Sequence, residues 1–134
     1  MISHHTALIY TMVLVSAADR RMPDSELRKI GEIIGTLPVF EGYNSKALTQ
    51  DAEACAELLS ADDGLDQAFN LIDEALPPKL RETAYVLACD IAAADQEVTP
   101  EESRMLEIIR DRLDIDRLVA TAIERGARAR FTKI

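Results

Sequence analysis

AADRRMPDSE at residues 17–26 returns as AADQEVTPEE at residues 93–102. Each stretch follows an apolar run and precedes an amphipathic one. When Asp19 is aligned with Asp95, seven of the 21 positions from 17 to 37 are identical, whereas composition alone gives roughly one or two. The repeat therefore predicts a duplicated helical hairpin, in which an Asp-led bend joins an apolar helix to an amphipathic helix.

The composition around this repeat is that of one all-α domain. Hydrophobic residues make up 48% of the 134 positions, enough to bury roughly two thirds of the unfolded surface in one core. Gly and Pro number only 5 each, while Ala, Leu, Ile, Glu and Arg are frequent, which favours helices because these side chains lose little rotamer freedom there. We expect a single domain over residues 1–134, with repeat copies at about 3–38 and 79–114, inserted helices at about 45–76 and a basic tail at about 125–134.

Apolar residues recur at helical spacing in about seven segments, so the expected architecture is a bundle of seven helices. The segments at about 3–18 and 79–94 are apolar nearly all round, which predicts two central helices that pack together. Pro38 and Pro77 end two of the segments, and Gly126 is the expected stop of the last one. The segments cover about residues 3–18, 24–37, 45–59, 63–76, 79–94, 100–113 and 115–125.

The charge of the chain is acidic and uneven. The net charge is -9, and the last ten residues contain four basic side chains, which leaves 11 basic against 24 acidic residues before them. Such a body repels phosphate backbones and anionic lipids, so we expect no nucleic-acid partner. The basic tail, with Arg125, Arg128, Arg130 and Lys133, is typical of cations that face the negative end of a last helix.

Cysteine usage and one apolar stretch indicate the compartment. Cys55 and Cys89 lie in apolar helical segments without metal-ligand spacing, which is typical of small buried side chains in a reducing environment. The apolar stretch 6–18 follows no Lys or Arg and recurs internally at 83–94, so it does not read as a leader. It is also too short to span a bilayer. We expect a cytoplasmic protein without membrane insertion.

Helix capping alone can explain part of the repeat. TPEE at 99–102 predicts a capping box, in which Thr99 and Glu102 bond to each other's backbone N–H groups and Pro100 needs no donor. Such a cap contributes about 1 kcal/mol. In the first copy, Pro23 stands at the position of Thr99 and cannot cap, and yet Glu26 is still present. This difference indicates that the repeated acid, Glu26 and Glu102, has a second role besides capping.

One candidate for this second role is the binding of a cation. If the two hairpins pack about a pseudo-twofold axis, their acids gather on one face and need compensation for their charge. Oxygen ligands suit Ca²⁺, Mg²⁺ or Mn²⁺, but Arg28 and Arg104 are also repeated and could neutralise the acids without a metal. The candidate ligands are Asp19, Glu26, Asp95 and Glu102.

The repeated motif resembles the TerB-like tellurite-resistance family. The family hallmark is Ala-Asp-Gly, an apolar residue three positions after the Asp, and Glu seven positions after it. The matching positions are Asp19, Met22 and Glu26, then Asp95, Val98 and Glu102. The resemblance covers nearly the whole chain. It implies an all-helical cytoplasmic protein linked to tellurite and general stress resistance, without established catalysis, working in metal-responsive assemblies near the membrane.

The chain departs from this hallmark at one position in each copy. Arg20 and Gln96 stand where the family usually has Gly. If the position has positive φ, either residue costs about 1 kcal/mol and loosens the geometry of an ion site.

Other polar residues have structural interpretations. The adjacent His4 and His5 are expected to lie on a frayed end. Asp90 lies in an apolar segment and needs a partner, either an Arg or a Tyr such as Tyr10 or Tyr85. SADDGLD at 60–66 imitates the hallmark but has no Glu at the matching position, so it predicts a turn and a cap.

Three functional hypotheses follow. The first is a non-enzymatic stress-response domain whose repeated acids bind a divalent cation or a basic partner. The resemblance implies that this partner belongs to a membrane-associated stress complex. The second is a helical protein-interaction module in which the acids only cap helices and form ion pairs. The third is a metal-dependent hydrolase, against which the lack of His ligands argues. Without a Ser or Cys beside a His base and without a glycine-rich loop, nucleophilic and nucleotide-dependent catalysis are disfavoured.

Overall fold

The computed structural model describes residues 1–18, 24–94 and 97–134. In these ranges the chain forms seven α-helices, three short 3-10 helices and no strand, so the predicted all-α class is confirmed. The elements are α1 (His4–Ser16), α2 (Asp24–Ile34), η1 (Pro38–Phe40), η2 (Ser45–Ala47), α3 (Leu48–Leu59), α4 (Gly64–Ala75), η3 (Pro78–Leu80), α5 (Arg81–Ala93), α6 (Pro100–Arg112) and α7 (Arg117–Arg130).

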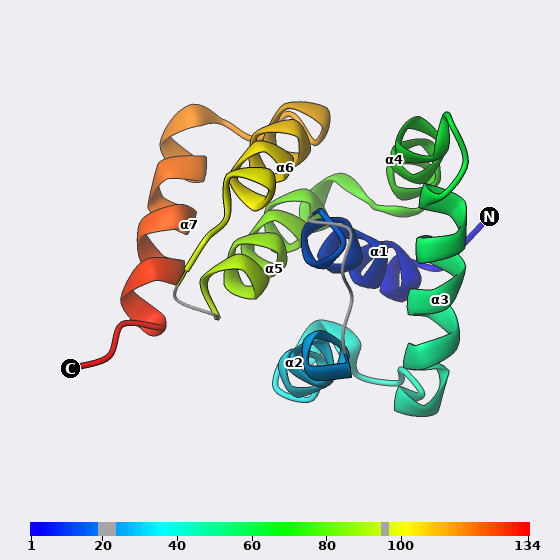
Figure 1. Ribbon diagram of the computed structural model, residues 1–134, viewed down its shortest axis with the longest axis horizontal. Coiled ribbons are helices and arrows are strands. Elements are labelled where there is room, and N and C mark those ends of the chain that lie inside the picture. The colour runs from blue at the N-terminus through cyan, green and yellow to red at the C-terminus, as the bar shows by residue number, and fades with distance from the viewer. Residues whose placement is uncertain (19–23, 95–96) are drawn as a thin grey trace.

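Two central helices organise the bundle. α1 packs along α5, and these two helices are covered by the others (Figure 1). α3 and α4 pack on α1 at one end of the long axis, whereas α7 packs on α5 at the other end. α6 contacts both central helices, and α2 lies across α1, α3 and α5. The all-round apolar character of the two segments predicted α1 and α5 as a central pair, and this is confirmed.

Burial explains why α1 takes the central position. All ten residues from Ala7 to Ser16 are buried, which matches a helix that is apolar on every side. The buried hydroxyl of Thr11 donates to the carbonyl of Ala7 at 2.9 Å and so is satisfied within the helix. α5 is similar, with Tyr85, Leu87 and Ile91 almost fully buried. The core therefore runs through the middle of the molecule along these two helices.

A close backbone approach fixes the turn between α3 and α4. A Cβ at Gly64 would lie 2.1 Å from the carbonyl oxygen of Leu58 and 2.8 Å from Cα of Leu59, so only glycine fits there. The turn expected over residues 60–66 is confirmed, but the expected side-chain cap is wrong. Asp63 stands at the N-cap without capping, and its carboxylate instead accepts from the Gln67 side chain at 2.7 Å.

The last helix is longer than its sequence pattern predicted. Gly126 was expected to stop it, but α7 continues to Arg130. Two tertiary contacts explain the extension: Ala127 is buried at 2% exposure, and Arg130 forms an ion pair with Asp90 of α5. Arg128 and Arg130 lie in the last turn, where the helix dipole favours cations, as the tail composition predicted. None of the described helices has the length and apolar character needed to cross a bilayer.

Candidate functional site

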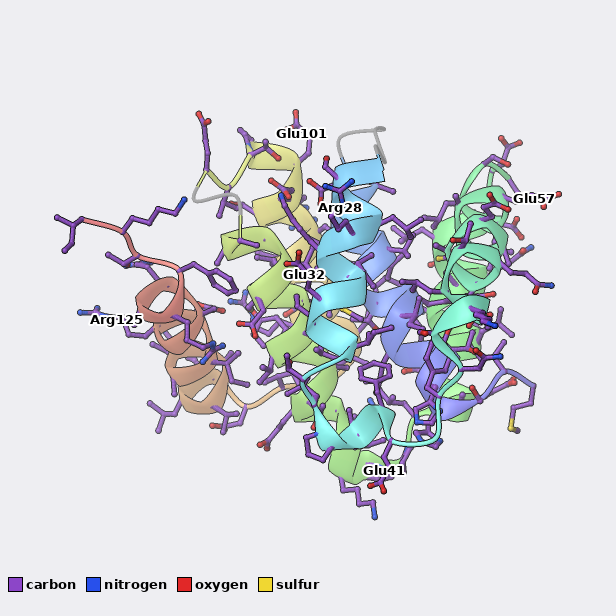
Figure 2. All side chains as sticks on the ribbon, turned by 90° about the horizontal axis from the view of Figure 1, so that it is seen from below. Arg28, Glu32, Glu41, Glu57, Glu101 and Arg125 are labelled. Atoms are coloured by element: carbon purple, nitrogen blue, oxygen red, sulfur yellow. The ribbon has the colours of Figure 1, made fainter. Side chains whose placement is uncertain are left out.

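The ends of the two predicted hairpins lie on the same side of the molecule. Ala18, just beyond the end of α1, lines one shallow surface pocket of about 400 Å³ together with the first turns of α6. Figure 2 places Arg28 of α2 and Glu101 of α6 at this same end of the bundle. The pocket is lined by Ala18, Pro100, Glu101, Arg104, Met105 and Ile108.

Glu102 is a capping residue. Its Oε1 accepts from the Thr99 backbone N–H at 3.0 Å, and the Thr99 hydroxyl accepts from the Glu102 N–H at 3.1 Å. Pro100 occupies the first turn, where no backbone donor is required. The capping box predicted from TPEE is confirmed. Glu102 is also 7% exposed, so it is a buried acid whose position is fixed by the start of α6.

Glu26 is held differently. Its side chain is 14% exposed, and its two oxygens have separate neighbours. Oε2 accepts from the Ser16 hydroxyl of α1 at 3.4 Å, and the ammonium of Lys29 lies 3.5 Å from Oε1. Both distances are at the long limit for a hydrogen bond, so these contacts leave the carboxylate weakly bound. Glu26 therefore couples the start of α2 to the end of α1.

The repeated arginines do not neutralise the repeated acids in equivalent ways. Arg104 pairs with Glu107, one turn along α6, at 2.9 Å, and the pair is largely exposed. Arg28 is exposed on α2. Among the described residues the Glu102 carboxylate bonds to the backbone of Thr99 and not to Arg104. The alternative that Arg28 and Arg104 neutralise the repeated acids stays a prediction, because Asp19 and Asp95 lie outside the described residues.

The other two predicted ligands, Asp19 and Asp95, lie outside the described residues. So do Met22 of the hallmark and Arg20 and Gln96, the two departures from the family glycine. Among residues 1–18, 24–94 and 97–134, no three His, Cys, Asp or Glu side chains gather as a metal site requires. The described part of the chain thus contains Glu26 and Glu102 as two separate members of the predicted set.

A cluster around His5 was missed by the sequence analysis. His5 was expected on a frayed end, but it lies in the first turn of α1 and its Nε2 donates to the carbonyl of Val39 at 2.8 Å. Its ring stacks on Phe40 at 5.6 Å and meets the edge of Tyr43 at 5.4 Å. Tyr43 donates to Asp51 at 2.7 Å, and its pKa is raised by burial and by that hydrogen bond. These contacts tie the start of α1 to the segment after α2.

A second pocket, of about 340 Å³, opens between α5, α6 and α7. On its wall the Tyr85 hydroxyl donates to Glu124 at 2.5 Å, and Arg110 lies 3.7 Å from the same carboxylate. Burial, followed by the hydrogen bond to Glu124, raises the pKa of Tyr85. This cluster joins all three helices and has the composition of a structural network rather than of an acid and base pair.

The two thiols have no nucleophilic character. Cys55 and Cys89 are free and buried, as their sequence context predicted. Burial raises the pKa of each to about 12, so both stay protonated at neutral pH. Cys89 lines the second pocket, but its protonated thiol is a poor nucleophile there.

Asp90 is satisfied by an arginine. Its side chain is 15% exposed and pairs with Arg130 at the end of α7. An Arg or a Tyr partner had been expected, and the Arg alternative is confirmed, since Tyr85 bonds to Glu124 instead. This acid therefore stabilises the packing of α7 on α5.

Comparison with known proteins gives one match. The family model described as tellurite resistance protein TerB matches residues 5–124. No curated protein and no solved structure matches the chain. The matched range extends from the first turn of α1 into the middle of α7, so it includes α2 to α6 in full and parts of α1 and α7.

Proposed function

This chain belongs to the TerB family, and from that premise we propose a non-enzymatic, cytoplasmic stress-response protein of the tellurite-resistance type. Its two repeated acidic bends bind one divalent cation, with Asp19 and Glu26 from the first copy and Asp95 and Glu102 from the second. The two copies descend from one duplicated hairpin. The whole of residues 1–134 acts as a single domain.

The position of the two hairpin ends carries this proposal. Ala18 precedes the first bend and Pro100 follows the second, and both residues line the same surface pocket. Because the first bend begins after Ala18 and the second ends before Pro100, acids on the two bends can reach a common ion near this pocket. Ca²⁺, Mg²⁺ and Mn²⁺ are the fitting ions, because every proposed ligand is a carboxylate oxygen.

The state of Glu26 supports the same proposal. A carboxylate that is mostly buried needs more compensation than one hydroxyl at 3.4 Å and one ammonium at 3.5 Å provide. A cation beside Oε1 and Oε2 would supply it. Glu102 has one oxygen engaged by the helix cap, so it would offer the other oxygen to the ion.

Calorimetric titration with Ca²⁺, Mg²⁺ and Mn²⁺ tests cation binding. We expect saturable heat with the wild-type chain and loss of that heat in the double variant Asp19→Asn with Asp95→Asn. Glu26→Gln should weaken binding at least about tenfold, since it removes a charged ligand. Glu32→Gln, on the exposed face of the same helix, is the matched control and should leave binding unchanged. Absence of heat with all three ions would overturn the proposal.

The capping box favours a second candidate, a helical interaction module without a metal. In this function Glu102 only caps α6 and Glu26 only pairs with Lys29. Thermal melts in the presence of each cation separate the two functions. An ion that binds the folded chain raises the melting temperature with concentration, whereas a module without a metal site melts at the same temperature throughout.

A further inference from the structure

The exposed face of α7 has the composition of a docking surface. One half of this helix packs on α5 through buried residues such as Ala120 and Ala127, and the opposite half is exposed. Between three arginines the exposed half has only Thr and Ala side chains, apart from Leu118, which is 81% exposed. We name this surface the α7 face, and it consists of Arg117, Leu118, Thr121, Ala122, Arg125, Arg128 and Ala129.

The α7 face is strongly basic in an acidic protein. Residues 117–134 contain five basic side chains and one acidic one, Glu124, whose carboxylate is engaged by Tyr85. Arg130 is neutralised by Asp90, but no ion pair of Arg117, Arg125 or Arg128 occurs with any residue in the described part of the chain. Three charges on this face are therefore without an ion-pair partner among the described residues.

The complementary charge lies at the opposite end of the molecule. Residues 48–76, which form α3, α4 and the turn between them, contain eight acidic side chains and no Lys or Arg. Arg125 and Glu57 project from opposite ends in Figure 2, and Figure 1 places α7 and the α3–α4 pair at the two extremes of the long axis. We name this second surface the acidic end. Its exposed carboxylates are Glu53, Glu57, Asp62, Asp63, Asp66 and Glu74.

Short side chains lie beside the charged residues on both surfaces. Glu53 and Glu57 are one turn apart on α3, about 6 Å along the axis, and Arg125 and Arg128 are separated by about 4.5 Å on α7. The residues beside each pair are short, Ala54 and Ala56 on α3 and Ala122 and Ala129 on α7, so two helices can approach closely. Because the surfaces are at opposite ends, they cannot meet within one chain.

We infer that the α7 face binds the acidic end of a second copy of this chain. The contact is heterologous and head to tail, because each copy uses its α7 face toward one neighbour and its acidic end toward another. Leu118 is the apolar anchor of the contact, and the arginine–glutamate pairs set its orientation. Since these charges are near the surface, salt weakens the assembly.

Sedimentation velocity tests this inference. In about 50 mM salt the wild-type chain should exceed its 14.8 kDa monomer mass as concentration rises, and in about 500 mM salt it should return to the monomer. Arg125→Glu with Arg128→Glu, and separately Glu53→Lys with Glu57→Lys, should each weaken association at least about tenfold. An equimolar mixture of these two variants should regain association, because the native surfaces still pair and the reversed α7 face of one variant is complementary to the reversed acidic end of the other.

A matched control and a combined variant complete the test. Glu32→Lys with Glu41→Lys makes the same change of net charge as Glu53→Lys with Glu57→Lys. Its two residues are exposed and lie away from both surfaces, so this variant should associate as the wild type does. The chain with all four α7 and α3 reversals should regain association. A wild-type monomer at every concentration in low salt, or association that survives both surface variants, would overturn the inference.

Discussion

Thr99 and Glu102 close a reciprocal pair of hydrogen bonds at the start of α6, at 3.0 and 3.1 Å. Because glutamine can accept the same bond from the Thr99 backbone, Glu102→Gln should retain the cap and change the unfolding free energy by less than about 0.5 kcal/mol. Thr99→Ala removes the hydroxyl acceptor and should cost about 1 kcal/mol. Urea unfolding of both variants measures these values.

For cation binding the order of the two variants should be reversed: Glu102→Gln should have the larger effect and Thr99→Ala the smaller one. Glu102→Gln removes a charged ligand and should weaken cation binding at least about tenfold, while Thr99→Ala keeps the carboxylate and should bind nearly as the wild type does. If both variants lose stability and neither affects binding, Glu102 is a cap alone.

The hydrogen bond between Tyr85 and Glu124 should stabilise the contact of α5 with α7. Tyr85 is 1% exposed, and its hydroxyl lies 2.5 Å from the carboxylate. Tyr85→Phe should lower the unfolding free energy by about 1 to 2 kcal/mol. Glu124→Gln preserves an acceptor and should cost less. Chemical denaturation checks both values. An unchanged free energy of unfolding in Tyr85→Phe would show that this hydrogen bond does not stabilise the fold.

Gly64 should tolerate no side chain. An added Cβ would meet the backbone of Leu58 at 2.1 Å, so Gly64→Ala forces α3 and α4 apart and should cost about 3 kcal/mol or more. Gly126→Ala is the control, because Gly126 lies inside α7 and its nearest neighbour is the flexible end of Arg130 at 3.4 Å. This second variant should be neutral or stabilising by up to about 1 kcal/mol. Equal losses in the two variants would contradict the described geometry.

Alkaline pH should destabilise the fold. Burial raises the pKa of Cys55 and Cys89 from 9.0 to about 12, so the folded state holds these protons more tightly than the unfolded state does. The stabilisation is complete below about pH 9 and declines as pH rises toward about 12. Tyr43 and Tyr85, whose pKa values are also raised, act in the same direction. Urea unfolding between about pH 7 and pH 10.5 should show a falling free energy of unfolding, and a flat profile would contradict burial of the thiols.

Local patterns in the sequence predicted the parts of the fold that local physics determines. The all-round apolar runs identified α1 and α5 as the centre, and TPEE identified the cap of α6, because burial of a whole helix and a capping box both depend on neighbouring residues. Gly126 was misread because the forces that continue α7, the burial of Ala127 and the Arg130–Asp90 pair, come from α5.

The four proposed metal ligands stay a prediction, and the contacts of several other polar residues were not predictable from local sequence. His5 was misread because its partners Val39, Phe40 and Tyr43 are more than thirty residues away in sequence. Likewise, the pairing of Arg104 with Glu107 rather than Glu102 depends on the rotamers of α6. The common pocket of Ala18 and Pro100 follows from helix packing that no local pattern encodes. Descent of both hairpins from one ancestral copy stays a prediction.

One nuclear magnetic resonance titration tests the central claim, that both acidic bends share a single cation. Mn²⁺, added in small steps to the ¹⁵N-labelled chain, broadens the amide signals nearest to it. The account predicts that the amide signals of Ala17 and Ala18, before the first bend, disappear together with those of Val98, Thr99, Glu101 and Glu102, after the second. They should disappear at one affinity, and Ca²⁺ or Mg²⁺ should restore them. Broadening of one bend alone, or of the acidic surface of α3 and α4 instead, would contradict the shared site.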